Sequence, residues 1–286
     1  MQKAAADRLV SVGLELGGKD PAYVRGDVDI AWAAEEIVDG AVFNSGQSCC
    51  SIERVYVDTT IHDRFVLEVK KVLEGYKLGD PSNPETHVGP VISKRSKETI
   101  EEHIRDALEK GATNETPENT TFKNPPAKGN FVAPTLLTGV THDMKVMKDE
   151  SFGPIIPVMQ VKSDRDAVEK MNDSEFGLTA SVWTKDTEKG YQIAEDVEAG
   201  TVFVNRCDYP AWVSAAAPRG TMRAVPHGPF DPVISLREGC MLTTLTPFQD
   251  LAWTGWKNSG KGVTLSRFGF DQFIKLKSYH LKDYPK

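Results

Sequence analysis

Apolar positions along this chain repeat at two spacings, one typical of amphipathic helices and one typical of buried strands. Residues 27–45 have the helical spacing, and Asp27 is placed to cap that helix. Two more helices are expected, one over residues 61–76 and one that follows Pro90 and ends at Gly111. Their apolar faces hold Ile61, Phe65, Val69, Val72 and Tyr76 in the first, and Ile100, Ile104 and Leu108 in the second.

Runs of β-branched residues predict strands between the helices. These runs are 52–57, 155–161, 179–183 and 201–204. Ser163, with Asp166 three residues later, opens a short helix, and a further helix over residues 187–198 is closed by Gly200. Residues 112–130 are polar and proline-rich, so we expect a surface excursion there. Strands that alternate with helices predict an α/β fold with a helix-covered sheet.

Composition narrows the class of protein. The 286 residues are 40% apolar and 26% charged, as in a soluble globular protein that can bury a sizeable core. A net charge of −7 argues against a nucleic-acid surface. There is no apolar run of the roughly 20 residues that a membrane span needs, and residues 1–8 lack the apolar core of a secretory signal. We therefore expect no membrane contact and a cytoplasmic location.

The spacing of cysteine and histidine argues against structural cross-links. Four cysteines, two of them adjacent, form neither a disulfide framework nor a Cys-x-x-Cys metal site. Six scattered histidines have no zinc-ligand spacing. A reducing compartment and no metal site are expected.

Two short segments carry residues suited to a reaction at a carbonyl group. Glu15 lies in Leu-Glu-Leu-Gly-Gly-Lys at residues 14–19, and Cys49 ends Asn-Ser-Gly-Gln-Ser-Cys at residues 44–49. A thiolate attacks a carbonyl, and a deprotonated water must release the adduct, so Cys49 is a candidate nucleophile and Glu15 a candidate general base. Taken alone, each also fits an ordinary role, as a small buried residue or a solvated surface charge.

Both segments, with their separation, resemble the paired active-site motifs of the NAD(P)-dependent aldehyde dehydrogenase superfamily. Residues 150–154, Glu-Ser-Phe-Gly-Pro, are similar to its Glu-x-Phe-Gly-Pro motif, and residues 253–262 are similar to its C-terminal Gly-x-Lys-x-Ser-Gly-x-Gly stretch. The four motifs follow one another in family order over nearly all of the chain. The resemblance implies a small-molecule aldehyde substrate, NAD or NADP as cofactor, and a homo-oligomer.

The resemblance also assigns roles to individual residues. In the pattern Gly-Gln-x-Cys the nucleophile is the second residue after Gln, which selects Cys49, and the base is Glu15. Glu150 and Phe152 would hold the nicotinamide ribose and ring, although an acid in a charged run and a core aromatic are the ordinary alternatives. Leu16 and Gly17 would pass close to the nicotinamide, because a residue without a side chain permits near approach of the backbone.

Other residues near these motifs are interpreted as structural. Cys50 is expected to pack, and Cys207 and Cys240 are structural or incidental. Lys257 and Ser259 could be ligand groups, but a glycine-rich structural turn is the preferred interpretation.

The chain departs from the family pattern in length. Members are close to twice as long, and in them most of a Rossmann-type cofactor domain precedes the Glu-Leu-Gly-Gly motif. We therefore expect an α/β aldehyde dehydrogenase-like catalytic domain with most of the Rossmann-type cofactor domain absent. Lost with it would be the turn that seats the pyrophosphate and the asparagine of the oxyanion hole. Activity of the isolated chain is expected to be impaired or absent.

A second departure is an insertion at residues 213–249, which holds five prolines, three arginines and no lysine. A translated intron and a genuine surface loop are the two explanations, and disorder is expected in either case. The expected organisation is a cofactor-domain remnant at 1–18, a catalytic domain at 19–212, the insertion, and at 250–286 the end of the catalytic domain with a C-terminal oligomerisation segment.

Two other functions stay open. One is a non-catalytic aldehyde dehydrogenase fragment that keeps the fold and an oligomer contact through residues 270–282. The other is a weak cysteine-dependent esterase, in which Cys49 and Glu15 act without hydride transfer.

Overall fold

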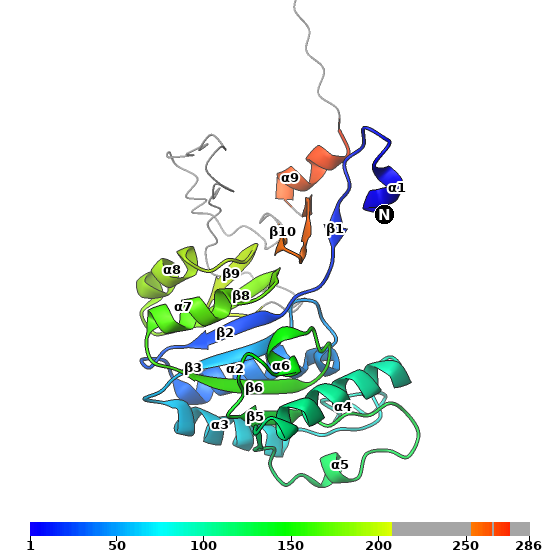
Figure 1. Ribbon diagram of the computed structural model, residues 1–286. Coiled ribbons are helices and arrows are strands. Elements are labelled where there is room, and N and C mark those ends of the chain that lie inside the picture. Colours follow the sequence, from blue (N-terminus) through cyan, green and yellow to red (C-terminus); the bar gives the residue numbers. More distant parts are fainter. Residues whose placement is uncertain (208–252, 265, 275–286) are drawn as a thin grey trace, which may run out of the picture. The chain divides into compact units, whose positions relative to one another are not determined.

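The computed structural model describes residues 1–207, 253–264 and 266–274 (Figure 1). These residues divide between two compact units. The larger unit holds residues 14–207 and 255–261, and the smaller unit holds residues 1–13, 253–254 and the described residues from 262 onward. The expected insertion at 213–249, Cys240, and the oligomerisation segment beyond residue 274 lie outside the described residues.

A mostly parallel sheet forms the centre of the larger unit. Its strands are β2 (Asp20–Val24), β3 (Ile52–Asp58), β4 (Thr113–Asn114), β5 (Thr135–Thr138), β6 (Ile155–Val161), β8 (Thr179–Trp183) and β9 (Thr201–Val204). They are hydrogen-bonded in the order β4-β5-β6-β3-β2-β8-β9, and only β4 runs antiparallel to its neighbour. Parallel sheets are buried on both faces, which explains the nearly continuous apolar runs of the central strands.

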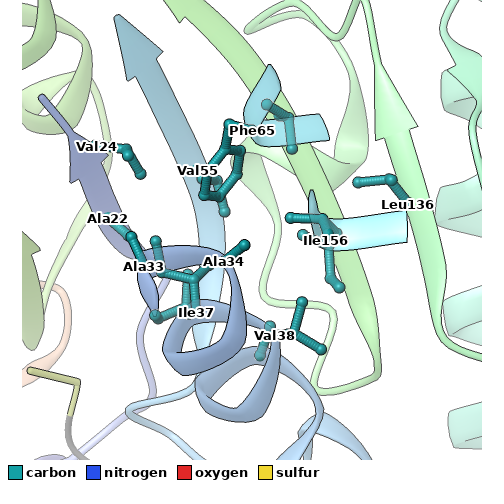
Figure 2. Close-up of a cluster of buried hydrophobic side chains, with 14 of the residues drawn as sticks. Ala22, Val24, Ala33, Ala34, Ile37, Val38, Val55, Phe65, Leu136 and Ile156 are labelled. Atoms are coloured by element: carbon teal, nitrogen blue, oxygen red, sulfur yellow. The ribbon is translucent and has the colours of Figure 1, made fainter. Parts of the chain in front are cut away.

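Helices cover both faces of this sheet. Residues of α2 (Ile30–Val42) and α3 (His62–Gly75) pack with Ala22 and Val24 of β2, whereas Tyr23 between them packs with the other set of helices. Figure 2 shows the first of these clusters, where Ala33, Ala34, Ile37, Val38 and Phe65 of the two helices meet Ala22, Val24, Val55, Leu136 and Ile156 of the strands. The other face is covered by α4 (Lys94–Glu109), α6 (Lys145–Lys148), α7 (Asp164–Asn172) and α8 (Thr187–Glu195). The larger unit is therefore an α/β fold, as its pattern of apolar positions predicts.

The start of α2 differs from the expected one. Asp29, and not Asp27, is the N-cap, and its side chain accepts a hydrogen bond from the backbone N–H of Trp32 at 3.3 Å. Both oxygens of Asp27 instead accept from the hydroxyl of Thr184, at 2.8 Å each. A long-range partner for Asp27 moves the first turn of the helix by a few residues.

Other boundaries also shift. The helix after β8 ends at Glu195 instead of continuing to residue 198, and Leu108 on α4 is 40% exposed instead of lying in the core. Within residues 112–130, β4 adds an edge strand, α5 (Thr120–Lys123) forms one turn, and buried Asn119 donates to the backbone carbonyls of Leu73 and Tyr76 at 3.1 and 2.8 Å. Only part of this segment is therefore a free surface excursion.

Short antiparallel pairs complete both units. In the larger unit, β1 (Leu14–Glu15) pairs with β12 (Gly260–Lys261), and β7 (Phe176–Gly177) pairs with β11 (Trp256–Lys257). The smaller unit contains α1 (Gln2–Ala5), the pair β10 (Trp253–Thr254) and β13 (Val263–Thr264), the turn α9 (Ser266–Gly269) and η3 (Phe270–Gln272). Within the described ranges, every helix is too short or too polar to cross a lipid bilayer.

Candidate active site

The motif segments are brought together because each one precedes a strand of the parallel sheet. Residues 15–19 lead into β2, residues 44–49 lead into β3, and residues 150–154 lead directly into β6. The order β6-β3-β2 makes these strands neighbours, and parallel neighbours begin at the same edge of a sheet. Open α/β sheets usually bind ligands at the carboxyl ends of their strands, whereas these segments gather at the amino ends.

A left-handed turn presents the cysteine segment. After α2 the chain forms η1 (Phe43–Gly46), in which Asn44, Ser45 and Gly46 have φ values of 50°, 61° and 71°. The side chain of Asn44 donates to the carbonyl of Gln47 and that of Gln47 donates to the carbonyl of Asn44, both at 3.0 Å. A Cβ on Gly46 would lie 2.3 Å from the carbonyl oxygen of Gly153, so only glycine lets this turn pack against the Glu-Ser-Phe-Gly-Pro segment.

Cys49 lies at the end of this turn, half-buried and as a free thiol. A hydrogen bond with the Cys50 side chain lowers the pKa of the Cys49 thiol to about 7, against burial and the negative charges of Glu15 and Glu150. A thiol with this pKa is substantially ionised at neutral pH, and thiolate is the nucleophilic form of cysteine. The Cys50 sulfur in turn lies 3.2 Å from the hydroxyl of Ser48.

Glu15 approaches Cys49 from a separate part of the chain. Glu15 is exposed in β1, opposite Gly260, and the neighbouring N–H of Leu16 donates to the carbonyl of Ser259 at 2.8 Å. Its charge is close enough to raise the pKa of Cys49. A Cβ on Gly18 would lie 2.7 Å from the Cys49 carbonyl oxygen, so the backbones of the two segments are in contact.

Residues 253–262, the C-terminal motif, include β12, the strand that pairs with the strand of Glu15. Ser259 is fully buried, and its hydroxyl accepts from the N–H of Gly177 at 2.9 Å. The ammonium of Lys257 donates to the carbonyls of Asn172 and Ser174 at 2.7 and 3.1 Å. Both polar side chains therefore hold a turn, which is the structural role preferred for them from the sequence.

Glu150 faces the same backbone. Its Oε1 accepts from the N–H of Gly18 at 2.9 Å, while burial raises the pKa of its carboxyl. Gly17 has a φ of 90°, and a Cβ at this position would lie 2.5 Å from that same oxygen. Glycine at position 17 is required both by the backbone conformation and by the closeness of the carboxylate.

Two apolar side chains remain partly exposed beside this carboxylate. Phe152 has a φ of 50°, which is costly for an aromatic residue, and 39% of its surface is exposed. Leu16 is 55% exposed. Leu16 adjoins Gly17, and Phe152 lies two residues after Glu150. Because Glu150 contacts Gly17, the Glu150 carboxylate and the two partly exposed apolar side chains belong to the same small region.

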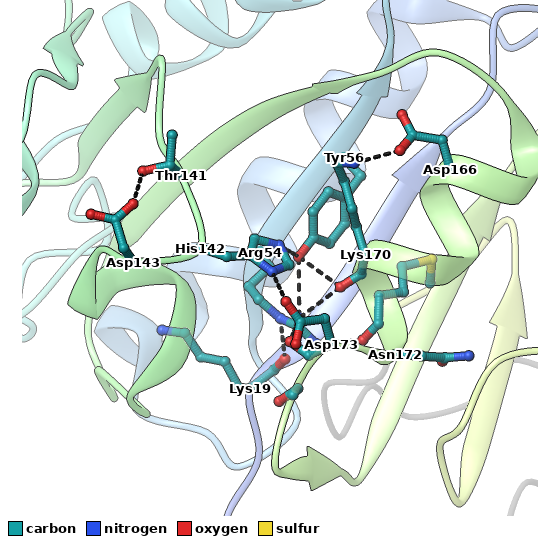
Figure 3. A network of polar contacts seen from close by, with 12 residues as sticks. Lys19, Arg54, Tyr56, Thr141, His142, Asp143, Asp166, Lys170, Asn172 and Asp173 are labelled. Atoms are coloured by element: carbon teal, nitrogen blue, oxygen red, sulfur yellow. Dashed lines mark hydrogen bonds and ion pairs between the residues drawn. The ribbon is translucent and has the colours of Figure 1, made fainter.

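Buried charged residues that were not predicted as site residues support these segments. Lys19 and Glu53 form an ion pair at 2.6 Å, with side chains only 1% and 4% exposed. Buried Arg54 donates from Nε to the carbonyl of Lys19 at 2.8 Å and from a terminal nitrogen to the carbonyl of Met171 at 3.0 Å. Figure 3 shows Arg54 within this network, between Lys19 and the end of α7. The sequence contains one sign of this network, because Glu53 and Arg54 interrupt the apolar run of β3. A charge in a central strand is costly unless it is paired, so both residues need buried partners.

Asp20 is a second buried acid at this edge. Its two oxygens accept from the N–H and the hydroxyl of Thr179, and burial raises its pKa well above the usual range. A gap beside Cys50, too small to hold a water molecule, is lined by Asp20, Pro21, Cys50, Ile52, Thr179, Ala180, Ser181, Phe203 and Cys207. Neither Cys49 nor Glu15 lines it. In the part of the chain that the structure describes, no cluster of three or more His, Cys, Asp or Glu residues is arranged to hold a metal.

Comparison with known proteins gives a consistent picture. Residues 1–221 match the model of the aldehyde dehydrogenase family. An aldehyde dehydrogenase from Davidiella tassiana is 40% identical over 205 residues, which are 72% of this chain and 40% of that protein. The chain spans about half the length of curated relatives that match it almost throughout.

Solved structures are similar over nearly the whole chain. An NADP-dependent glyceraldehyde-3-phosphate dehydrogenase from Bacillus halodurans C-125, complexed with NADP, has a TM-score of 0.71 and 33% identity, with 92% of this chain and 46% of that chain covered. A betaine aldehyde dehydrogenase from Staphylococcus aureus, in complex with NAD+, has a TM-score of 0.74 and 28% identity, with 95% and 46% covered. The α/β class expected from the sequence, and the resemblance stated on its motifs, are confirmed.

Proposed function

The chain belongs to the aldehyde dehydrogenase family, and on that basis we propose that it carries the nucleophile and the base that oxidise a small aldehyde to a carboxylate with NAD or NADP. Cys49 is the nucleophile and Glu15 the general base. The observation that carries the proposal is the contact between the backbones at Gly18 and Cys49, which brings Glu15 close enough for its charge to act on a thiol whose pKa the Cys50 side chain lowers. Activated thiols and nearby carboxylates are the pairing that covalent catalysis at a carbonyl needs.

The first step is addition of the Cys49 thiolate to the aldehyde. The sulfur forms a bond to the carbonyl carbon, and the π electrons move to oxygen to give a thiohemiacetal oxyanion. The backbone N–H at Cys49 would donate to that oxygen, and backbone donors aimed at a developing oxyanion lower the barrier. Because the thiol is already partly ionised at neutral pH, no separate base is needed for this step.

The residues around Glu150 fit a nicotinamide nucleotide. The Glu150 carboxylate, oriented by the N–H of Gly18, would accept hydrogen bonds from ribose hydroxyls, and the exposed Phe152 ring would pack against the nicotinamide. Gly17 and Leu16 would line the same contact, where a side chain on residue 17 has no room. When bound, NAD+ or NADP+ supplies the hydride acceptor that turns the thiohemiacetal into a thioester on Cys49.

The last step is hydrolysis of that thioester. Glu15 takes a proton from a water molecule, the resulting hydroxide adds to the thioester carbonyl, and the carbon–sulfur bond breaks. The products are a carboxylate and the regenerated Cys49 thiolate. The exposed position of Glu15 gives it direct access to water.

An absorbance assay for NAD(P)H with a panel of small aldehydes tests the proposal on the full chain. Cys49→Ala should abolish turnover, whereas Glu15→Gln should still form the thioester in a single turnover and then release product slowly. Cys207→Ala is the matched control, because that thiol donates to the Glu36 carbonyl and takes no part in the proposed chemistry. Turnover that survives Cys49→Ala would refute the role of Cys49.

A cysteine-dependent esterase is the second candidate. It is favoured by the fact that Cys49 and Glu15 act on each other without any contribution from a bound nucleotide. Hydrolysis of p-nitrophenyl acetate that is lost in Cys49→Ala, without NAD(P)H formation from any aldehyde, would select this function over the dehydrogenase.

Self-association is also part of the proposal, since family resemblance implies a homo-oligomer. Light scattering of the purified full chain measures its mass directly. A monomer at micromolar concentration would argue against the assembly.

A further inference from the structure

The carboxylate of Glu53 binds three hydrogen-bond donors from two segments of the site. Its Oε1 accepts from the N–H of Phe152 at 2.8 Å. Its Oε2 accepts from the N–H of Ser151 at 2.8 Å and from the ammonium of Lys19 at 2.6 Å. Charge-assisted hydrogen bonds of this length are the strong ones in proteins, and here they are shielded from water.

An ion pair with Lys19 does not by itself explain this geometry. Pairing with the ammonium occupies only Oε2, whereas Oε1 is directed at the backbone of Phe152. A carboxylate that accepts hydrogen bonds from two successive N–H groups, here those of Ser151 and Phe152, fixes the orientation of the peptide between them. Glu53 therefore acts on the conformation of the Glu-Ser-Phe segment as well as on charge balance.

The segment needs such a constraint because Phe152 is held in a left-handed conformation. A φ of 50° is disfavoured for a residue with an aromatic side chain and persists only where the surroundings impose it. The next residue, Gly153, packs closely against Ile100, since a Cβ on Gly153 would lie 2.4 Å from the Ile100 side chain. Together these contacts direct the Phe152 ring outward, where 39% of it stays exposed.

Ser151 and Lys19 tie the same segment to its neighbours. The Lys19 ammonium donates to the Ser151 hydroxyl at 3.1 Å, and Nδ1 of buried His103 lies 3.0 Å from that hydroxyl. Lys19 directly follows Gly18, whose N–H holds Glu150. Loss of the Glu53 carboxylate would therefore release the backbone of Ser151 and Phe152 and leave the Lys19 ammonium without its anion.

We propose that Glu53 is a positioning residue that orders residues 150–152, the segment to which the proposed function assigns the nicotinamide cofactor. It acts through Phe152 and Glu150 and touches neither substrate nor cofactor, because its own side chain is buried. The inference rests on the proposed function for its link to the cofactor, whereas the ordering of the segment stands on the geometry alone.

Amide hydrogen exchange on the full chain tests the ordering without any ligand. In Glu53→Gln one carboxylate oxygen becomes an NH₂ group, which repels a backbone N–H. Exchange of the peptide that spans residues 149–153 should rise by about tenfold or more, the size expected for losing a hydrogen bond to a charged group. Exchange in β6 should rise less than this, because β6 reports only the global stability lost when the Lys19 ammonium is left without its anion. Glu115→Gln, at a half-exposed pair with Lys70, is the matched control.

Cofactor binding and thiol chemistry are then measured on the same variants. NAD(P)H fluorescence should show Kd raised by about tenfold or more in Glu53→Gln. The burst of p-nitrophenol from the Cys49 reaction should remain within about twofold, because no nicotinamide takes part in it. Glu53→Asp keeps the charge but shortens the side chain, so it should restore part of the affinity. If Glu53→Gln does not fold, Lys19→Met with Glu53→Gln removes the unpaired buried charge and is measured instead.

The outcomes separate the two proposals. A rise of exchange that is larger at residues 149–153 than in β6, together with weaker NAD(P)H binding, supports the positioning role. An equal rise of exchange in β6 and in residues 149–153, or unchanged NAD(P)H affinity despite local loosening, overturns it. If the unsubstituted chain binds neither NADH nor NADPH, the proposed function fails, and the exchange result alone then decides whether Glu53 orders the segment.

Discussion

The backbone N–H of Gly18 donates to Oε1 of Glu150 across 2.9 Å, although 132 positions separate the two residues in the chain. The bond joins the segment that carries the proposed base to the segment proposed to hold the cofactor. These two segments precede β2 and β6, and β3, the strand that the cysteine segment leads into, lies between β2 and β6 in the sheet. A change at either residue should therefore affect cofactor binding before it affects thiol chemistry.

Gly17→Ala should weaken NAD(P)H binding by about tenfold or more, since its Cβ would lie 2.5 Å from Oε1 of Glu150 and must displace that carboxylate. Fluorescence titration measures the affinity. Gly111→Ala is the control, because Gly111 also has a positive φ, at 99°, but nothing lies within 4 Å of its added Cβ. Equal effects of the two substitutions would mean that backbone strain, and not the contact with Glu150, causes the loss.

The alkylation rate of Cys49 by iodoacetamide should rise with a midpoint near the pKa of about 7. Cys50→Ala should move this midpoint to higher pH, because the hydrogen bond from Cys50 is the largest influence that lowers the pKa of Cys49. Tandem mass spectrometry assigns the alkylation to Cys49, and not to Cys50 in the same peptide or to Cys207, and Cys207→Ala is the control. A midpoint that stays in place without Cys50 would assign the low pKa to another cause.

Glu15→Gln should move the same midpoint to lower pH. The negative charge of Glu15 raises the pKa of Cys49, so its removal makes the thiolate easier to form. Alkylation of Cys49 should become faster below neutral pH, whereas hydrolysis of the Cys49 thioester should become slower because its proposed base is lost. Glu68→Gln, at the surface pair with Lys71, should change neither rate. Slower alkylation in Glu15→Gln would contradict the proximity of the two groups.

Local patterns predicted much of the fold because β-branched runs and helical spacing act within a few residues. The strands at Ile155–Val161, Thr179–Trp183 and Thr201–Val204 begin and end where those runs do. The predicted N-cap of α2 was wrong because Asp27 accepts from Thr184, a partner 157 positions away, and Asp29 caps the helix instead. Boundaries that rest on distant partners are not visible in local sequence.

The candidate site was predictable as residues but not as an arrangement. Glu15, Cys49 and Glu150 could be named from their motifs, whereas their convergence requires the strand order β6-β3-β2. Glu53 and Arg54 were missed because two adjacent charges in a strand indicate burial with partners without saying which partners. Only the fold shows that Glu53 accepts from the Phe152 N–H and that Arg54 donates to the Lys19 carbonyl.

Lys19→Met should destabilise the chain by roughly 3–5 kcal/mol, because it leaves the Glu53 carboxylate buried without its cation. Urea unfolding followed by circular dichroism measures the free energy of unfolding. Lys71→Met removes a cation from the exposed pair with Glu68 and should cost about 0–1 kcal/mol. Similar values for the two variants would mean that the Lys19–Glu53 pair is accessible to water.

Asp20→Asn should remove part of the pH dependence of stability. The pKa of Asp20 is raised by burial well above the 3.8 of a solvated carboxyl, so the folded chain keeps a proton that the unfolded chain releases. Stability from this group is fully present below pH 3.8 and falls by up to ~1.4 kcal/mol per pH unit as the pH rises toward the folded pKa.

Asparagine imitates the protonated acid, since its oxygen can accept from the N–H of Thr179 and its NH₂ can donate to the Thr179 hydroxyl. The variant should therefore gain stability relative to the natural chain as the pH rises from 4 to 7. Urea midpoints for both chains across this range give the difference, which cancels every other titrating group. Parallel curves would show that Asp20 ionises as readily in the folded chain as in the unfolded one, and its burial beside Thr179 would then carry no electrostatic cost.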